Sequence, residues 1–398
     1  MNIKTIRCPV CKHSKILKKF LGRSTITGYV CKKEKESINQ PVFDIKINFC
    51  LNCNVLFQSH VKGAEKILKN IYKNHQIIFR NSKFYKNYYQ KLIKIIKSSL
   101  NIKKKNKVIE IGANDGSFLK TLSLKIKASF FAVESSKIIK KNFPKNIILL
   151  NNFFNLQLAN KIKKRYGSMD YIIVRHVLEH IKNPINFFKL LKKISNLETM
   201  MLIEVPYLVS IFKFKRFENI SYSHLIHYNI KSMILLANSC GFFIIKYKLV
   251  KTDGGSIVFF LKKTKKKNSL SVIPKLEHKR NFLFMFNKFC KLFFQSKKNF
   301  DNFIKKNSKG KRTIGFGAGA KGQFLIHMYN MKKYMQYVID ETKFYCNKFI
   351  PGTNIKIINL KKALKMRESL IINLAPTHYT QIQDKIGTKH KLYDLINN

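Results

Sequence analysis

The sequence of 398 residues predicts an α/β protein with two Rossmann-like units behind a small cysteine-containing module. Two observations predict the units: short apolar runs alternate with helix-like segments after residue 107, and the same alternation starts again at residue 312. Two close cysteine pairs near the N-terminus predict the module. We therefore expect the module at 1–70, the first unit at 71–265 and the second unit at 266–398.

Each expected element follows from its local pattern. Residues 71–106 have helical spacing and end in a lysine run. Apolar runs predict five buried strands, at 108–111, 130–133, 147–150, 171–174 and 201–203. We expect a hairpin, a polar linker and a long helix next, at 242–261, 262–269 and 276–306. The last unit has predicted strands at 312–316, 337–340 and 369–373.

The composition is strongly basic, with 78 Lys and Arg against 20 Asp and Glu and a formal charge of +58. Such a charge suggests a polyanionic partner, but the basic residues run from Lys4 to Lys391 instead of gathering in one segment. With abundant Asn, Ile and Phe and no Trp, this is typical of an AT-rich genome, so nucleic acid is not the expected partner. Apolar runs stay below the roughly 18 residues that span a bilayer, and the start lacks a signal-peptide core, which predicts a cytoplasmic protein without a membrane span.

The N-terminal cysteines have the spacing of a metal site. Cys8 and Cys11 form one C-x2-C pair, and Cys50 and Cys53 form the other. Two such loops present four thiolates to one tetrahedral ion, and four thiolates leave no open coordination position. We therefore predict a structural Zn²⁺, which would also stabilise a module of about 70 residues with a small core.

A glycine-containing turn follows the first predicted strand, over 110–116. Its glycines let the backbone approach a ligand, while the acidic residues at 110 and 115 suit an amine or sulfonium group better than a pyrophosphate. Glu134 ends the next strand, where a carboxylate can accept both ribose hydroxyls of an adenosine. This pattern predicts S-adenosylmethionine (SAM), with cofactor contacts from Glu110, Gly112, Asn114, Asp115, Gly116, Glu134, Asn152 and His176.

Two segments carry candidate catalytic residues. His180 follows the fourth predicted strand, at the carboxyl edge where ligands bind in such sheets. The segment 217–228 holds two His and two Tyr close together, including Tyr222 and His224. An imidazole titrates near neutral pH, so His180 and His224 are candidate acid/base groups, with Tyr222 as a third candidate.

A second glycine-rich turn, at 315–322, follows the first strand of the last unit. Its backbone amides, the helix N-terminus and Lys321 could hold phosphates. Asp340 and Asn373 end later strands of the same unit.

In this order, the motifs resemble the three-domain SAM-dependent C-methyltransferases of nucleotide-linked deoxysugars. The resemblance rests on the four cysteines, the turn 110–116, the segment ending in His180 and Ile-Glu-Val-Pro-Tyr at 203–207. It also rests on Gly-Gly-Ser at 254–256, the turn 315–322, Val-Ile-Asp at 338–340 and Pro-Gly-Thr at 351–353. It implies a zinc domain, a SAM-binding Rossmann domain and a C-terminal Rossmann-like domain in an enzyme for polysaccharide or deoxysugar synthesis. The implied reaction is C-methylation of a keto sugar through an enolate, with His180 and His224 at the family's histidine positions.

The chain departs from the family where the family's substrate loop carries Tyr and Glu, because Ser221 and Ser223 stand there. The general base and the choice between C- and O-methylation therefore stay open, as do the sugar, its nucleotide and the oligomeric state. A zinc-containing RNA methyltransferase is a second hypothesis, disfavoured because Asn183-Pro184-Ile185 is not the Asn-Pro-Pro-aromatic motif of amino-methylating enzymes. A binding protein that has lost its chemistry is a third.

Overall fold

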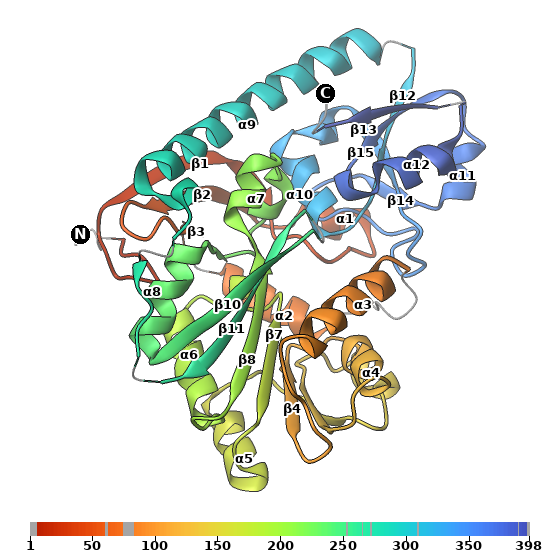
Figure 1. The fold of residues 1–398 in the computed structure, drawn as a ribbon. Coiled ribbons are helices and arrows are strands. Elements are labelled where there is room, and N and C mark those ends of the chain that lie inside the picture. Colours follow the sequence, from red (N-terminus) through yellow and green to blue (C-terminus); the bar gives the residue numbers. More distant parts are fainter. Residues whose placement is uncertain are drawn as a thin grey trace.

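The computed structural model describes residues 6–59, 63–74, 83–251, 254–264, 266–270, 273–308, 310–388 and 390–395. Its strands form three sheets, joined by helices on the sheet faces (Figure 1). The strands are β1 (Ile16–Thr25), β2 (Val42–Cys50), β3 (Leu56–Gln58), β4 (Lys107–Ile111), β5 (Ser129–Val133), β6 (Ile148–Leu150), β7 (Tyr171–Arg175), β8 (Met200–Pro206), β9 (Ile226–His227), β10 (Phe242–Val250), β11 (Ser256–Lys263), β12 (Arg312–Phe316), β13 (Met335–Ile339), β14 (Lys356–Ile358), β15 (Ser369–Asn373) and β16 (Lys391–Asp394).

Helices connect most of these strands. The α-helices are α1 (Glu34–Ile38), α2 (Ala64–Lys73), α3 (Lys83–Lys97), α4 (Ser117–Ser123), α5 (Leu156–Tyr166), α6 (Pro184–Lys193), α7 (Leu208–Lys213), α8 (Ile230–Cys240), α9 (Lys279–Asn307), α10 (Ala320–Met328), α11 (Leu360–Leu364) and α12 (Tyr379–Ile386). The short 3-10 helices are η1 (Ile139–Asn142), η2 (Leu178–His180), η3 (Phe217–Ile220), η5 (Lys275–Glu277), η6 (Met331–Lys333) and η7 (Pro376–His378).

The first sheet is antiparallel and has the order β1-β2-β3-β9. Its first three strands come from the N-terminal segment, in which the sequence pattern predicted no strands. The fourth, β9, lies far along the chain and pairs with β3 through Leu56 opposite His227 and Phe57 opposite Ile226. The N-terminal sheet is therefore completed by the segment that carries the candidate catalytic residues.

The second sheet has the order β10-β11-β8-β7-β4-β5-β6. Strands β6, β5, β4, β7 and β8 run parallel, whereas β11 lies antiparallel between β8 and β10. The five predicted strands and the hairpin are confirmed as β4 to β8, β10 and β11. This is a Rossmann-like fold with an added antiparallel hairpin, and its strand order reverses between β4 and β7, at the kind of position where open α/β sheets bind ligands.

The third sheet is parallel throughout, in the order β14-β13-β12-β15-β16. The three strands predicted for the last unit are confirmed as β12, β13 and β15, while the edge strands β14 and β16 were not predicted. The order reverses between β12 and β15, which is the kind of position where open α/β sheets bind ligands.

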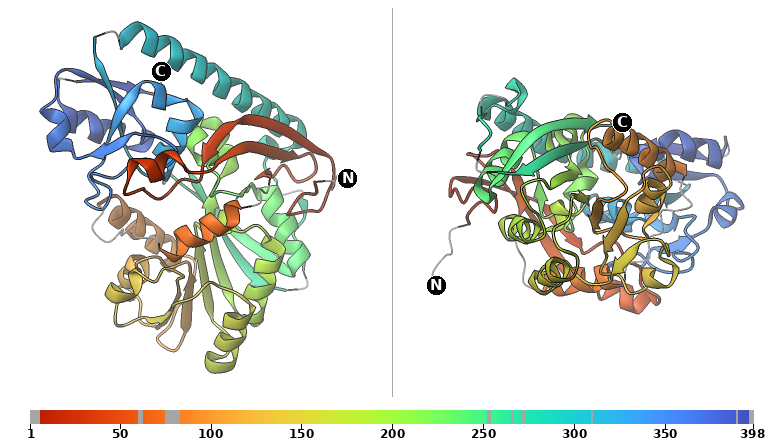
Figure 2. Two further views of the ribbon diagram at one scale, coloured as in Figure 1. Left: turned by 180° about the vertical axis from the view of Figure 1, so that it is seen from behind. Right: turned by 60° about the horizontal axis from the view of Figure 1, so that its bottom comes forward.

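The predicted long helix is α9, which packs against the N-terminal sheet and against both Rossmann-like units. Its phenylalanines recur at helical spacing: the ring of Phe286 stacks on Phe49 at 4.8 Å, and that of Phe289 lies 5.0 Å from Phe212. Farther along, Phe300 meets Tyr329 at 5.7 Å. Figure 2 shows the N-terminal strands lying between the two Rossmann-like units. The domain boundaries at 70 and 265 stay a prediction.

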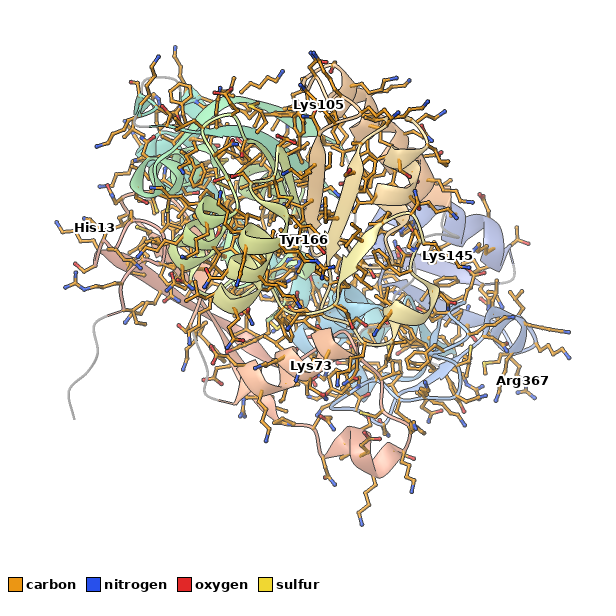
Figure 3. The ribbon with its side chains drawn as sticks, turned by 90° about the horizontal axis from the view of Figure 1, so that it is seen from below. His13, Lys73, Lys105, Lys145, Tyr166 and Arg367 are labelled. Carbon is orange, nitrogen blue, oxygen red and sulfur yellow. The ribbon has the colours of Figure 1, made fainter. Side chains whose placement is uncertain are left out.

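Among the described residues, no helix combines the length and apolar character needed to cross a membrane. The basic side chains cover many parts of the surface, as Lys73, Lys105, Lys145 and Arg367 show by their separate positions around the view (Figure 3).

Candidate functional site

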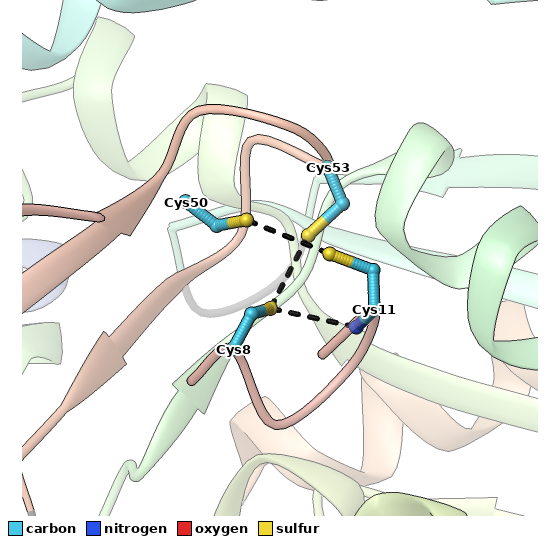
Figure 4. A group of neighbouring side chains, drawn as sticks. All are labelled: Cys8, Cys11, Cys50 and Cys53. Atoms are coloured by element: carbon cyan, nitrogen blue, oxygen red, sulfur yellow. Dashed lines mark hydrogen bonds between the residues drawn. The ribbon is translucent and has the colours of Figure 1, made fainter. Parts of the chain in front are cut away.

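Four cysteine sulfurs converge at the end of the first sheet (Figure 4). The Sγ atoms of Cys8 and Cys53 are 3.5 Å apart, and those of Cys11 and Cys50 are 3.6 Å apart. Zn–S bonds of about 2.3 Å in a tetrahedron place sulfurs about 3.8 Å apart. In the two loops, the amide of residue 12 donates to the Cys8 carbonyl and that of residue 54 donates to the Cys50 carbonyl. The spacing and the thiolate chemistry both fit a tetrahedral ion, so the four sulfurs can hold one metal.

The turn after β4 requires glycine at its first position. Gly112 has a φ of +76°, and a Cβ there would lie 2.3 Å from Cγ2 of Val177. Asn114 is left-handed too, at φ 48°, a conformation that Asn tolerates better than most residues. Gly116 has a φ of +70°, and a Cβ there would lie 2.7 Å from Phe143 and 2.8 Å from Pro144. Val177, Phe143 and Pro144 are therefore packed closely against the two glycines, and this packing restricts the backbone of the turn.

Glu134 lies beside this turn, at the carboxyl end of β5. Its Oε2 accepts from the Asn114 amide at 2.9 Å, and its Oε1 accepts from the Ser136 amide at 2.8 Å. Burial raises the pKa of Glu134, while these amides oppose the shift. Each oxygen keeps further acceptor capacity, so the half-buried carboxylate can accept the two hydroxyls of a ribose.

Glu110 points into the protein instead. Glu110 is fully buried. Its Oε1 accepts a hydrogen bond from Nε of Arg175 at 2.8 Å and lies 2.7 Å from Nη2 of the same guanidinium. The guanidinium also lies over the Phe118 ring, 3.9 Å from its centroid. The other oxygen of Glu110 has no hydrogen-bond partner among the described residues. A direct cofactor contact by Glu110 stays a prediction; what the geometry shows is that it anchors Arg175.

His176 is the centre of a second charged group at the same edge. Its Nδ1 lies 3.4 Å from Glu179 and its Nε2 lies 3.6 Å from Glu204. Burial lowers the pKa of His176, but the two carboxylates outweigh burial and raise it to about 10, so the ring is charged. Glu204 also accepts from Ser256 Oγ at 2.5 Å and from the Tyr88 hydroxyl, which explains the Ser of the Gly-Gly-Ser motif.

The remaining predicted cofactor residues surround the turn. Asp115 is buried and accepts from the Ser117 amide at 3.1 Å, at the start of α4. Asn152 is exposed, and its side chain accepts from the Phe153 amide at 2.8 Å. Neighbouring Asn151 donates to the Glu134 carbonyl at 2.8 Å, which ties the third strand's loop to the turn. Their contacts with a cofactor stay predictions.

His180 and His224 lie face to edge, with ring centroids 5.0 Å apart. Nδ1 of His180 donates to the Ser223 carbonyl at 2.7 Å and lies 3.2 Å from the Tyr72 hydroxyl. Nδ1 of His224 donates to the Asn219 carbonyl at 3.0 Å. Because a carbonyl can only accept, both rings carry a proton on Nδ1, which leaves Nε2 as the lone-pair nitrogen whenever a ring is neutral.

The environment keeps His224 neutral. Burial, then the neighbouring His180 and His227 and the cation of Lys321, hold the pKa of His224 well below its usual value. A neutral imidazole with a free Nε2 is a general base. Lys321 belongs to the second glycine-rich turn, so the C-terminal unit contributes to the electrostatics of this site.

The loop of His224 is held by the N-terminal module. Nε2 of Gln58, the last residue of β3, lies 3.0, 2.6 and 3.1 Å from the carbonyls of Ile220, Ser221 and His224. Tyr222 is buried, with its ring 5.8 Å from Phe43 and its hydroxyl 3.4 Å from the Ser59 carbonyl. A catalytic role for Tyr222 stays a prediction, because the contacts with Phe43 and Ser59 are contacts with the N-terminal module.

Buried His227 predicts a pH-dependent stability. Its ring is 1% exposed, both nitrogens lack hydrogen-bond partners among the described residues, and burial lowers its pKa to about 4. Between pH 6.5 and 4 the unfolded chain therefore binds a proton that the folded chain does not, so stability falls as pH falls, by up to about 3 kcal/mol. In urea unfolding at several pH values, His227→Leu should remove this part of the dependence. An unchanged pH slope would contradict it.

Sequence reasoning missed Tyr72, Tyr88 and Gln58 as parts of the site. Tyr72 and Tyr88 lie on helices with no motif around them, and only the fold brings them to His180 and Glu204. Arg175 carried a usable signal, since it directly precedes His176 at a strand end. Asn183 and Pro184 are the N-cap and first residue of α6, which gives that pair a structural role.

Comparisons with known proteins match most of the chain to methyltransferases. Residues 83–246 match a methyltransferase domain, and residues 251–391 match the C-methyltransferase C-terminal domain. The chain is 20% identical over 377 residues to the C-methyltransferase NovU of Streptomyces niveus, covering 89% of this chain and 86% of that protein.

Solved structures resemble part of the chain. Magnesium protoporphyrin IX methyltransferase of Synechocystis is 13% identical, with a TM-score of 0.36 over 51% of this chain and 95% of that one. The N-methyltransferase NodS of Bradyrhizobium japonicum is 10% identical, with a TM-score of 0.34 over 46% of this chain and 98% of that one. The two domain matches together span residues 83–391 apart from 247–250, and with the likeness to NovU they indicate a SAM-dependent methyltransferase that is similar to C-methyltransferases over most of its length.

Proposed function

We propose that the protein transfers the methyl group of SAM to carbon in a nucleotide-linked keto sugar. The observation that carries the proposal is the ring contact between His180 and His224, which lie 44 residues apart in sequence and both donate from Nδ1 to a backbone carbonyl. A reaction that removes a proton from carbon needs a base, whereas methylation of an already nucleophilic atom does not.

In the proposed reaction, Nε2 of His224 removes the proton from the carbon next to the keto group. The C–H electron pair forms a carbon–carbon double bond, and the keto oxygen takes the negative charge of the enolate. The deprotonated carbon then forms a bond to the SAM methyl as the methyl–sulfur bond breaks. The Tyr72 hydroxyl lies beside His180, and we propose that it donates to the enolate oxygen. Atoms balance with S-adenosylhomocysteine as the second product and the proton on His224.

Glu134 is proposed to hold the ribose of SAM, next to the turn 110–116. When bound, SAM supplies the electrophilic methyl. Buried Glu110, Arg175, Tyr88 and Glu204 form a connected group across the ends of β4, β7 and β8. We propose that this group keeps the strand ends in fixed positions beneath the cofactor.

Zn²⁺ is the proposed occupant of the four-cysteine cluster, in a structural role, since four thiolates complete its coordination. The chemistry that a metal supplies there is limited to holding the loops at 8–11 and 50–53 together. A place in polysaccharide synthesis and a cytoplasmic location stay predictions.

The reaction is tested with ¹³C-methyl SAM and a panel of 4-keto-6-deoxy sugar nucleotides. The carbon-13 shift of the product methyl distinguishes a carbon-bound from an oxygen-bound group. In D₂O without SAM, the enzyme should also exchange the proton next to the keto group, which an O-methyltransferase has no need to remove. An oxygen-bound methyl without such exchange would favour the O-methylation alternative, and methylation of structured RNA instead of any sugar would favour the RNA hypothesis.

Glu134→Gln should weaken S-adenosylhomocysteine binding by about ten- to a hundredfold, since hydrogen bonds to a charged acceptor contribute about 1.5–3 kcal/mol. Calorimetric titration measures this affinity directly. Glu198→Gln is the matched control, because Glu198 lies in the same unit with its side chain 83% exposed. Equal affinities of the two variants for S-adenosylhomocysteine would show that Glu134 does not bind the cofactor.

A further inference from the structure

Two histidines and one glutamate converge where η2 meets the loop of His224. A carboxylate oxygen of Glu179 and one ring nitrogen each of His180 and His224 all lie within 4.8 Å of one another. Nitrogen and oxygen ligands that share one ion at about 2.0–2.2 Å lie about 3.4 Å apart in a tetrahedron. Side-chain shifts of about an ångström are therefore enough to close these three groups on an ion.

The two rings are already oriented as metal ligands are. A histidine that binds a metal through one nitrogen almost always donates from its other nitrogen to a carbonyl, a carboxylate or water, which fixes the ring. Here Nδ1 of His180 lies 2.7 Å from the Ser223 carbonyl, and Nδ1 of His224 lies 3.0 Å from the Asn219 carbonyl. In both rings Nε2 is therefore the nitrogen that is available to an ion.

Glu179 supplies an observation that is independent of the histidines. The residue is only 1% exposed, and its Oε1 lies 3.4 Å from Nδ1 of His176. Its Oε2 is buried and has no hydrogen-bond partner among the described residues. A buried carboxylate oxygen without a partner is costly, and the proposed methyl transfer does not use it. A cation held beside His180 and His224 would satisfy this oxygen.

The ligand atoms select a class of ion. Two imidazole nitrogens and one carboxylate oxygen suit Zn²⁺ and other first-row transition ions, whereas Mg²⁺ and Ca²⁺ prefer oxygen ligands alone. Three protein ligands also leave a coordination position open, unlike the four thiolates of the cysteine cluster. The two clusters therefore differ in the number and in the kind of their ligand atoms, so that an ion in one can be told from an ion in the other.

We propose that Glu179, His180 and His224 form a second, exchangeable metal site, and that Zn²⁺ bound there inhibits methyl transfer. In the proposed reaction Nε2 of His224 removes the substrate proton, and a lone pair that is bound to an ion cannot accept a proton. Zn²⁺ in the cysteine cluster would then support the fold, while Zn²⁺ in the second site would block the base. The inhibition rests on the proposed function, whereas the metal site does not.

The site is tested with Co²⁺, a coloured probe of zinc sites, added to the zinc-loaded full chain. Cobalt bound by nitrogen and oxygen absorbs visible light without the sulfur-to-cobalt charge-transfer band that thiolate ligands add. We expect uptake of about one cobalt per chain without that band, while elemental analysis still finds about one zinc. Excess Mg²⁺ should not displace the cobalt. The formal charge of +58 disfavours cations over the surface in general, so general electrostatic attraction would not explain the uptake.

Two variants remove a ligand each. Glu179→Gln keeps the shape of the side chain but loses the charged oxygens, and His180→Gln loses the ring nitrogen. Each should weaken cobalt binding at least about tenfold, since loss of a hydrogen-bond partner of a ligand alone typically costs about 10- to 100-fold. Glu198→Gln and His278→Gln, at exposed residues, are the matched controls and should bind cobalt as the wild type does. A cooperative thermal transition shows that each variant is folded.

Absence of cobalt uptake by the wild type overturns the site without using any variant. Uptake that brings the sulfur band also overturns it, because cobalt would then have replaced the zinc of the cysteine cluster. Equal uptake by the ligand variants and their controls has the same meaning, since the cobalt would lie elsewhere.

Inhibition is measured as methyl transfer from labelled SAM at increasing buffered concentrations of free Zn²⁺. The rate should fall as the second site fills, by about 10²-fold or more at saturation, which is the contribution of a general base. It should recover when a chelator removes the second ion and leaves the cysteine-bound zinc in place. An unchanged or rising rate with the site filled overturns the inhibition and leaves the proposed function standing. If cobalt fills the site but no keto-sugar nucleotide is methylated, the proposed function fails while the metal site stands.

Discussion

His224→Gln is expected to lower kcat for methyl transfer by about 10²- to 10⁴-fold while leaving the affinity for S-adenosylhomocysteine unchanged. Gln keeps a polar side chain of similar size in the buried position but cannot take up a proton. The pH dependence of the wild-type rate is a second expected result. Because the pKa of His224 is held well below its usual value, the rate should not decrease as pH falls through 6.5. Stopped assays with labelled SAM over a pH series measure both.

The control is His278→Gln, at an exposed histidine at the start of α9 that should keep full activity. An unchanged affinity for S-adenosylhomocysteine separates a lost base from a disturbed fold, and solvent exchange in D₂O then tests the base itself, because proton removal from the substrate does not need SAM. If His224→Gln keeps exchange but loses methyl transfer, another group removes the proton, and Nε2 of His180 is next in reach. A plateau that ends near pH 6.5 would show that the working base has an ordinary imidazole pKa.

Removal of Zn²⁺ is expected to unfold the N-terminal module and to stop catalysis. Structural zinc contributes about 10–16 kcal/mol in small zinc modules, which exceeds the stability of most domains. Cys53→Ser removes a fully buried ligand and should lower both the zinc content and the thermal midpoint. Elemental analysis of the purified protein gives the metal content, expected near one zinc per chain.

Cys346→Ser is the matched control, because Cys346 lies outside the cluster and should change neither quantity. Loss of zinc should also lower kcat, because β3 and Gln58 hold the loop of His224. A protein that purifies without metal, yet stays folded and active, would contradict the structural role.

Regular elements were predictable where a single local pattern determines them. Runs such as 172–174 are buried on both faces of a parallel sheet, so their apolar character alone marks them as a strand. Strand β9 could not be found this way, because two residues carry no periodicity and their partner lies in β3. Edge strands β14 and β16 are short and border on polar loops, which hides them in the same way.

The candidate site was predictable as a set of residues but not as a set of contacts. Glu110, Glu134, His176 and His180 could be predicted from their positions near the ends of predicted strands, because ligands bind at that edge of such a sheet. The pairing of Glu110 with Arg175 depends on which way the side chains point once both strands lie side by side. Tyr72 reaches His180 from a helix more than 100 residues earlier in the chain, and no local pattern encodes that contact.

The late arrival of β9 has a consequence for how the chain is made. On the ribosome, β1, β2 and β3 are complete by residue 58, but the strand that closes their sheet is synthesised only at residues 226 and 227. Until then β3 is an open edge that can pair with another chain. Capture of zinc by the early cysteines would shape the nascent segment during this interval, so we expect zinc-starved cells to lose the protein to aggregation during translation.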